Sequence, residues 1–151
     1  MRQIRTLLFL AAVPLFVQTA LAQSDEKDAV ATVQRTFDGM AAHDEAMIRS
    51  TFLPEAKLYA IRDTGATSTA SVDDFAARIA AAKGALLEKF TEKPKVLIRA
   101  NMAQVWGEYD FLRDGKFDHC GVDSVSLFKT ADGWKIAAIV YTSETTGCKG
   151  H

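Results

Sequence analysis

Three residues that could perform acid–base chemistry fall on two adjacent predicted strands: Tyr109 on one, and His119 and Asp123 on the next. In the strand register that we favour, Tyr109 is a cross-strand neighbour of His119, and Asp123 lies further along the same face. Burial raises the pKa of an aspartate and histidine titrates near neutrality, so Asp123 could act as a base and His119 could move a proton. His119 or Tyr109 would then donate a hydrogen bond to a developing oxyanion.

The same residues also allow a structural interpretation. His119 and Asp123 could hydrogen-bond to each other near the sheet edge and fix the curvature of the sheet, because structural networks also gather polar groups. The catalytic residues are therefore unknown, and Asp123 and His119 are the best candidates. We expect a ligand pocket lined by Tyr59, Tyr109, Phe111, His119 and Asp123. Tyr59 could equally be a half-buried packing residue.

An antiparallel meander must position these side chains. Three alternating apolar segments, residues 103–112, 119–129 and 134–143, are separated by the dipeptides Asp114-Gly115 and Asp132-Gly133. Asp-Gly between such segments is a strong signal for a hairpin turn. A meander of this length must bury at least one face, and the upstream helices are available to cover it.

The loop of the first hairpin decides which side chains share a face. A two-residue turn would place three polar residues of the first strand opposite the apolar face of the second, which is costly. We therefore expect a three-residue loop, residues 113–115, with Gly115 left-handed in a bulge. This register puts Gly107 opposite Gly121 and leaves open space there. It aligns Ala103, Val105, Tyr109 and Phe111 with His119, Asp123, Val125 and Leu127.

Helical periodicity and caps predict the rest of the chain. Ser24 should cap a helix over residues 23–43, and Asp44 should cap a second, short helix that Pro54 ends. A strand follows at residues 56–62, and Ser71 with Asp74 forms a capping box for a third helix. Residues 85–92 have a helical composition but could be an irregular connection. Residues 95–100 read as a strand.

The first 22 residues predict a secretory signal peptide. Arg2 and Arg5 precede an apolar stretch at residues 6–17, and residues 20–22 form a small-x-small cleavage signal. The apolar stretch is short for a membrane span, although an uncleaved anchor is the alternative. Cleavage would leave residues 23–151 as one domain, secreted or periplasmic, with room for a real core.

Composition and cysteine content narrow the choice of partners. The chain has 18 basic and 19 acidic residues and no basic run, which disfavours nucleic acid or an anionic membrane as a partner. The three histidines have no ligand spacing, so no metal and no cofactor are expected. Cys120 and Cys148 should form a disulfide in an oxidising compartment, because the second hairpin brings them together; two free thiols are the alternative.

The order helix, helix, strand, helix and then antiparallel strands resembles the nuclear transport factor 2-like superfamily, an α+β fold of the cystatin-like type. The sequence GMAAHDEAMIRSTFLPEAKLYA at residues 39–60, residues 103–144 and Cys148 are similar to its SnoaL-like and putative lumazine-binding branches. The resemblance implies a strongly curved antiparallel sheet packed on the N-terminal helices, a half-barrel with a cone-shaped apolar pocket. It also implies dimers that form through the opposite sheet face.

We expect an exported protein that binds a small hydrophobic molecule in an apolar pocket. The superfamily includes isomerases, dehydratases and cyclases as well as binding proteins, so a cofactor-independent acid–base enzyme using Asp123 and His119 is the alternative. A second alternative is a non-catalytic interaction module. Trp106, Val122 and Phe128 predict an apolar outer sheet face, and hence a possible homodimer.

Overall fold

The computed structural model describes residues 16–149, with side chains from residue 23 onward, so the predicted signal peptide lies outside the residues whose side chains are described. In chain order the elements are α1 (Phe16–Ala41), α2 (Glu45–Thr51), β1 (Phe52–Arg62), β2 (Thr67–Ser71), α3 (Val72–Ala81), β3 (Leu86–Phe90), β4 (Lys95–Arg99), β5 (Met102–Arg113), β6 (Lys116–Thr130) and β7 (Gly133–Ser143). The helices and strands that the sequence predicts occur in the predicted order, and the structure adds the strands β2 and β3. Within residues 16–149, none of the helices has both the length and the apolar content of a membrane span.

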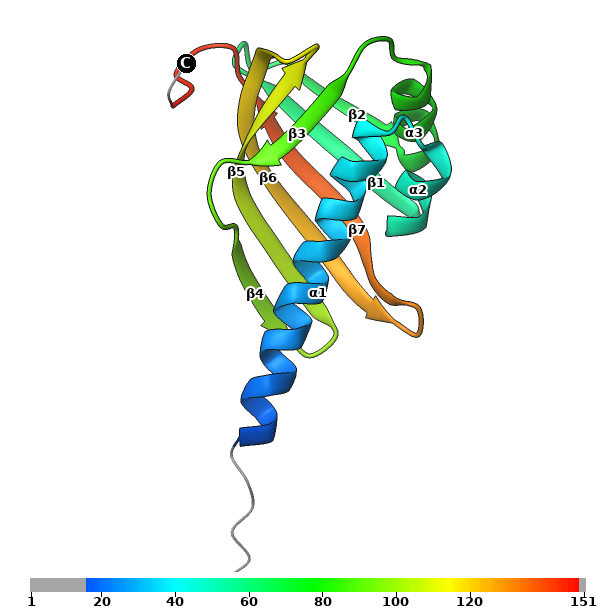
Figure 1. The fold of residues 1–151 in the computed structure, drawn as a ribbon, viewed down its shortest axis with the longest axis vertical. Coiled ribbons are helices and arrows are strands. Elements are labelled where there is room, and N and C mark those ends of the chain that lie inside the picture. Colours follow the sequence, from blue (N-terminus) through cyan, green and yellow to red (C-terminus); the bar gives the residue numbers. More distant parts are fainter. Residues whose placement is uncertain (1–15, 150–151) are drawn as a thin grey trace, which may run out of the picture.

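Seven strands form one mixed sheet, in the order β2-β1-β7-β6-β5-β3, with β4 also paired to β5. All neighbouring pairs are antiparallel except β1 and β7, which are parallel. The prediction of an entirely antiparallel sheet is therefore wrong, because no tight turn joins β1 to β7 and fixes their relative direction. The strand order leaves both ends of the sheet open, so it is not a closed or strongly curled barrel (Figure 1).

The three helices cover one face of this sheet. Helix α1 crosses the face diagonally, and α2 and α3 lie beside β1 and β2 (Figure 1). Val33 of α1 is fully buried in the same apolar cluster as Val105, Leu127 and Ile136 of three central strands. Burial of each such side chain stabilises the fold by about 1.5–3 kcal/mol, which anchors α1 to the sheet.

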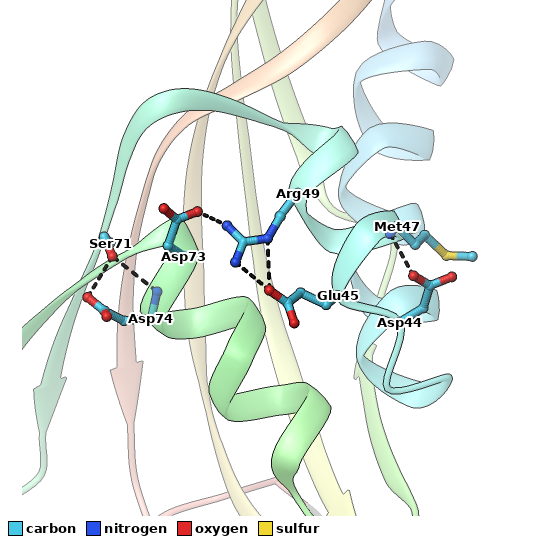
Figure 2. Close-up of polar contacts among 7 residues, drawn as sticks. All are labelled: Asp44, Glu45, Met47, Arg49, Ser71, Asp73 and Asp74. Atoms are coloured by element: carbon cyan, nitrogen blue, oxygen red, sulfur yellow. Dashed lines mark hydrogen bonds and ion pairs between the residues drawn. The ribbon is translucent and has the colours of Figure 1, made fainter.

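Two predicted helix caps are confirmed. The Asp44 carboxylate accepts a hydrogen bond of 2.8 Å from the backbone N–H of Met47 at the start of α2. The Ser71 hydroxyl accepts one of 3.1 Å from the N–H of Asp74 and donates one of 2.6 Å to the Asp74 carboxylate (Figure 2). Ser24 does not cap α1, because that helix begins upstream at Phe16.

Arg49 joins the two short helices. Its guanidinium forms ion pairs with Glu45, one turn away on α2, and with Asp73 in the first turn of α3 (Figure 2). Helix α2 ends at Thr51, and the chain enters β1 at once, so Pro54 lies in the strand rather than at the helix end. The ion pairs fix where α3 starts, and α3 forms one wall of the site described below.

The first meander hairpin differs from the predicted loop. Asp114 and Gly115 form a two-residue turn, both with positive φ (51° and 74°), and Arg113 pairs with Lys116. A bulge follows, because Phe117 pairs with Leu112 but His119 pairs with Phe111, which leaves Asp118 as an extra residue on β6. The bulge, rather than a longer loop, keeps the polar residues off the apolar face.

The predicted faces of this hairpin are correct, but the cross-strand partners are shifted by two residues. Tyr109 lies opposite Gly121, not His119, and Gly107 lies opposite Asp123, not Gly121. The two-residue turn shifts the pairing by one position relative to a three-residue loop, and the extra bulge residue Asp118 shifts it by a second position. The inner face still carries all the predicted members: Ala103, Val105, Tyr109, Phe111, His119, Asp123, Val125 and Leu127.

Residues 86–90, whose composition suggested a helix or an irregular connection, form the edge strand β3. β3 pairs antiparallel with β5, and Glu88 lies opposite Phe111. The Asp114 carboxylate accepts a hydrogen bond of 2.8 Å from the N–H of Ala85 just before the strand. Pairing with β5 thus outweighs the local helical preference, as tertiary contacts commonly do.

The predicted disulfide between Cys120 and Cys148 is confirmed, with an S–S distance of 2.11 Å and a Cα–Cα distance of 5.9 Å. Cys120 also exchanges backbone hydrogen bonds with Glu144, at 3.0 and 2.8 Å. The bond therefore fastens the segment after β7 to the start of β6.

Candidate functional site

A cavity of about 430 Å³ lies between the inner face of the sheet and helices α1 and α3. Apolar and polar side chains both contribute to its wall. The apolar lining comes from Phe37, Met40, Leu58, Ala60, Phe75, Ile79, Phe111 and Ile139. The titratable lining residues are Arg62, Arg78, Glu88, Tyr109, Arg113, Asp118, His119, Asp123 and Tyr141.

Asp123 and Glu88 form a carboxyl pair inside this cavity. Asp123 is only 4% exposed and sits on β6 between Gly107 of β5 and Tyr141 of β7. Its carboxyl is hydrogen-bonded to that of Glu88, which reaches in from β3 and is itself partly buried. Two carboxyl groups can share such a bond only when one of them holds a proton.

The environment of the pair raises the pKa of both carboxyl groups. Burial raises the pKa of Asp123 to about 7, although the hydrogen bond from Glu88 favours its ionised form. Burial and the neighbouring Asp123 carboxylate raise the pKa of Glu88 well above its usual range. Glu88 is therefore the member of the pair that more readily holds the shared proton, while Asp123 can gain or lose one near neutral pH, which is the behaviour of a general base.

Tyr109 is held by the backbone rather than free to serve a ligand. Its side chain is 2% exposed, and its hydroxyl donates a hydrogen bond of 2.8 Å to the carbonyl oxygen of Thr142. A Cβ atom on Gly121 would lie 2.1 Å from that same oxygen, so only glycine allows this approach. Burial and the nearby carboxyl groups raise the pKa of Tyr109, so its proton stays on this bond. The predicted role of Tyr109 as an oxyanion donor is therefore not supported.

His119 pairs with Asp118, the bulge residue, and not with Asp123. Its Nδ1 lies 2.7 Å from the Asp118 carboxylate, and its ring stacks on Phe111 with centroids 4.8 Å apart. That hydrogen bond is the main reason why the pKa of Asp118 lies below its usual range. His119 and Asp123 are four residues apart on one strand, roughly 13 Å at strand spacing. The predicted His119–Asp123 hydrogen bond is wrong.

Of the five predicted pocket residues, Tyr109, Phe111, His119 and Asp123 line the cavity. Tyr59 does not line it, because its side chain points to the other sheet face and is 45% exposed. Its neighbours along β1, Leu58 and Ala60, line the cavity instead, since alternate residues of a strand face opposite sides. Binding of a ligand by any of these residues stays a prediction.

Sequence reasoning missed Glu88 and Tyr141. Leu86, Glu88 and Phe90 alternate along β3, and a strand assignment for this segment would have placed a lone carboxyl on an apolar face. Tyr141 lies on β7 directly opposite Asp123, and burial raises the pKa of its hydroxyl. Its position depends on a register shift between β6 and β7, near Ser126 and Leu127. No sequence pattern predicts this shift.

Three arginines from different elements also line the cavity: Arg62 at the end of β1, Arg78 on α3 and Arg113 at the end of β5. All three side chains are exposed, so they mark the side of the cavity that opens to solvent, here called the arginine mouth. Among the residues that the structure describes, no group of three histidine, cysteine or acidic side chains is placed to hold a metal ion.

A family model described as "Putative lumazine-binding" matches residues 24–142 of this chain. The chain belongs to the putative lumazine-binding family. No curated protein matches this member of the family.

The fold of this lumazine-binding family member is similar to that of solved nuclear transport factor 2-like proteins, which have a cystatin-like fold. A protein of that description from Novosphingobium aromaticivorans has a TM-score of 0.69 and 12% identity, over 92% of this chain and 95% of that chain. A protein from Kribbella flavida has a TM-score of 0.65 and 19% identity, over 81% and 92%. A structure from Streptomyces avermitilis, described as a putative dehydratase of the same superfamily, has a TM-score of 0.66 and 14% identity, over 81% and 97%. At these identities the likeness shows the fold alone.

Proposed function

We propose that this protein is an exported binding protein for a small, mainly apolar molecule, which occupies the cavity between α1, α3 and the sheet. The cavity volume of about 430 Å³ falls within the range of small-molecule sites, roughly 300–1,000 Å³. Its wall also combines apolar side chains with polar groups that converge on the cavity, as small-molecule sites do. This cavity would be the counterpart of the cone-shaped pocket that the superfamily resemblance implies, although the sheet around it is open.

One observation carries this proposal: the Glu88–Asp123 carboxyl pair inside the cavity. Burial of two carboxyl groups costs stability, and such groups gather at functional sites more often than in ordinary cores. A pair that shares a proton can both donate and accept hydrogen bonds. It therefore suits a neutral ligand edge with an N–H beside a carbonyl group, as on the bicyclic ring of lumazine, the molecule in the family's name.

A fluorescence titration with lumazine tests the proposal. We expect saturable binding by the wild-type protein and at least tenfold weaker binding by Glu88→Gln combined with Asp123→Leu, which removes the shared proton and the Asp123 acceptor. Ala60→Phe, which adds a ring inside the cavity, should weaken binding as well. Glu55→Gln, on an exposed position of β1, is the matched control and should bind as the wild type does. Lack of saturable binding by lumazine, and by small apolar dyes, would refute the proposal.

A second candidate function is acid–base catalysis, favoured by the Asp123 pKa of about 7. Asp123 would remove a proton from a carbon beside a carbonyl group, and the protonated Glu88 would donate a hydrogen bond to the carbonyl oxygen as charge develops there. The proton then returns to another carbon in an isomerase or to a leaving hydroxyl in a dehydratase, the description given to the Streptomyces avermitilis structure. His119 has no part in this version, because Asp118 holds it.

Hydrogen–deuterium exchange separates the two candidates. In D₂O, an enzyme of this kind should exchange the acidic C–H of a bound carbonyl compound, and NMR follows the loss of that signal. Asp123→Asn should abolish the exchange and leave the affinity within a fewfold of the wild type. Exchange that persists in Asp123→Asn would remove Asp123 as the base.

We also propose export and a homodimer. The predicted signal peptide and the Cys120–Cys148 disulfide support an oxidising compartment, since disulfides are rare in the cytosol. The sheet face away from the helices carries exposed apolar side chains, whereas a solvated sheet face usually carries polar ones. This difference supports the dimer. These side chains are Tyr59, Leu97, Met102, Trp106, Phe128 and Val140.

A further inference from the structure

The arginine mouth carries more positive than negative charge. Of the acidic residues that line the cavity, only Asp118 lies with the arginines, and it is already paired with Arg113 (3.6 Å) and His119 (2.7 Å). The other two acidic lining residues are the inner carboxyl pair, which carries no more than one negative charge while it shares a proton. Arg62 and Arg78 are therefore the cations of the mouth that no acidic lining residue pairs with.

The acids next to these two arginines outside the cavity are engaged elsewhere. Asp63, beside Arg62, accepts hydrogen bonds from the hydroxyl (2.9 Å) and backbone N–H (3.3 Å) of Thr145. The Asp74 carboxylate, one turn before Arg78, accepts a hydrogen bond from the Ser71 hydroxyl. Both carboxylates feel the arginine charges, but neither forms an ion pair with them among the described residues.

Arg78 and Arg62 also act on the interior of the cavity. The Arg78 guanidinium lies 5.6 Å from the centre of the Phe75 ring, which holds it over the apolar wall. The charges of both arginines favour the ionised form of Tyr141, the cross-strand neighbour of Asp123. Their positive potential therefore reaches Tyr141, which also lines the cavity.

We infer that the ligand of this cavity is an amphiphilic anion, with one carboxylate-like or sulfonate-like group at Arg62 and Arg78 and an apolar body inside. The inference rests on the proposed ligand-binding function and adds the charge and direction of the ligand. The carboxyl pair enforces that direction, because a negative group at the inner end would meet Asp123 whenever it is ionised. The anion therefore faces the mouth, and a neutral edge of the ligand faces the pair.

Two probes with the same aromatic body test this inference. N-phenyl-1-naphthylamine is neutral, and 8-anilino-1-naphthalenesulfonate is the same molecule with one sulfonate. Two exposed ion pairs correspond to about a two- to thirtyfold preference for the sulfonate at low salt, which added salt should reduce. Arg62→Gln combined with Arg78→Gln should remove the preference and leave the neutral probe unchanged. Arg35→Gln, on an exposed position of α1 away from the cavity, is the control.

Cavity-blocking variants show where the probes bind. Ala60→Phe, and Ser68→Trp at an exposed position of the cavity lining, should each weaken both probes. Equal affinity for the two probes, or a preference that survives the double arginine variant, would overturn the inference and leave the proposed binding function intact. Failure of both probes to bind, or binding that neither blocking variant weakens, would overturn both.

Discussion

Replacement of Asp123 by asparagine should stabilise the protein at alkaline pH, because the native state must ionise this carboxyl in a buried place. Burial raises its pKa from the usual 3.8 to about 7. Between these two values the folded state binds a proton that the unfolded state has released, so stability falls as pH rises through this window. Above pH 7 the loss is complete, and below pH 4 it is absent.

The size of this effect follows from the same pKa. One pKa unit corresponds to about 1.36 kcal/mol, so ionisation of Asp123 costs the wild type about 4 kcal/mol at pH 8 relative to pH 4. That is a large part of the 5–15 kcal/mol that stabilises a typical domain. Asparagine keeps the shape and a hydrogen bond to Glu88 but does not titrate, so Asp123→Asn should gain up to about 4 kcal/mol over the wild type at pH 8 and almost nothing at pH 4.

Urea unfolding followed by tryptophan fluorescence at four pH values from 4 to 8 measures this difference. Asp118→Asn is the matched control, because the pKa of Asp118 is lowered and its partly exposed carboxylate stabilises the fold at neutral pH. The control should therefore be slightly less stable than the wild type at pH 8. A difference between wild type and Asp123→Asn that does not grow from pH 5 to pH 8 would refute the buried carboxyl pair.

Three further predictions concern the frame around the site. Gly121→Ala should cost about 1–3 kcal/mol or more, since the new Cβ meets the Thr142 carbonyl oxygen; thermal unfolding measures this, and an unchanged Tm would contradict it. Cys120→Ser with Cys148→Ser should cost about 3–4 kcal/mol for a loop of this length, and added reductant should destabilise the wild type but not this variant. Light scattering should find a dimer that Trp106→Lys converts to monomer, and a monomeric wild type would exclude the proposed interface.

Much of the sheet could be read from local sequence. Asp114-Gly115 fixes the first hairpin, because few other residues adopt the positive φ that its tight turn needs. The second hairpin forms where it was predicted, but its two turn residues are Ala131 and Asp132, and Gly133, with positive φ, is the first residue of β7. The face that carries Tyr109 and Asp123 was correct although the loop was not, because burial selects the apolar face and the bulge at Asp118 adjusts the register to it.

The edge strand β3 and the pairing of strands far apart in the sequence could not be predicted from local sequence. β3 has a helical composition and becomes a strand only because β5 offers it hydrogen-bonding partners. The parallel pairing of β1 with β7 likewise joins segments with six elements between them, and no turn signal marks it. Glu88 and Tyr141 therefore could not be assigned to the site in advance.

By itself the sequence determined the positions of the two meander hairpins, two helix caps and the disulfide, because each depends on residues whose local chemistry allows few alternatives. Only the tertiary structure decided which carboxyl faces Asp123 and which residue holds His119. Those contacts join β3 to β6 and the bulge to its neighbour, and their energies depend on burial and distance, which exist only once the chain has folded.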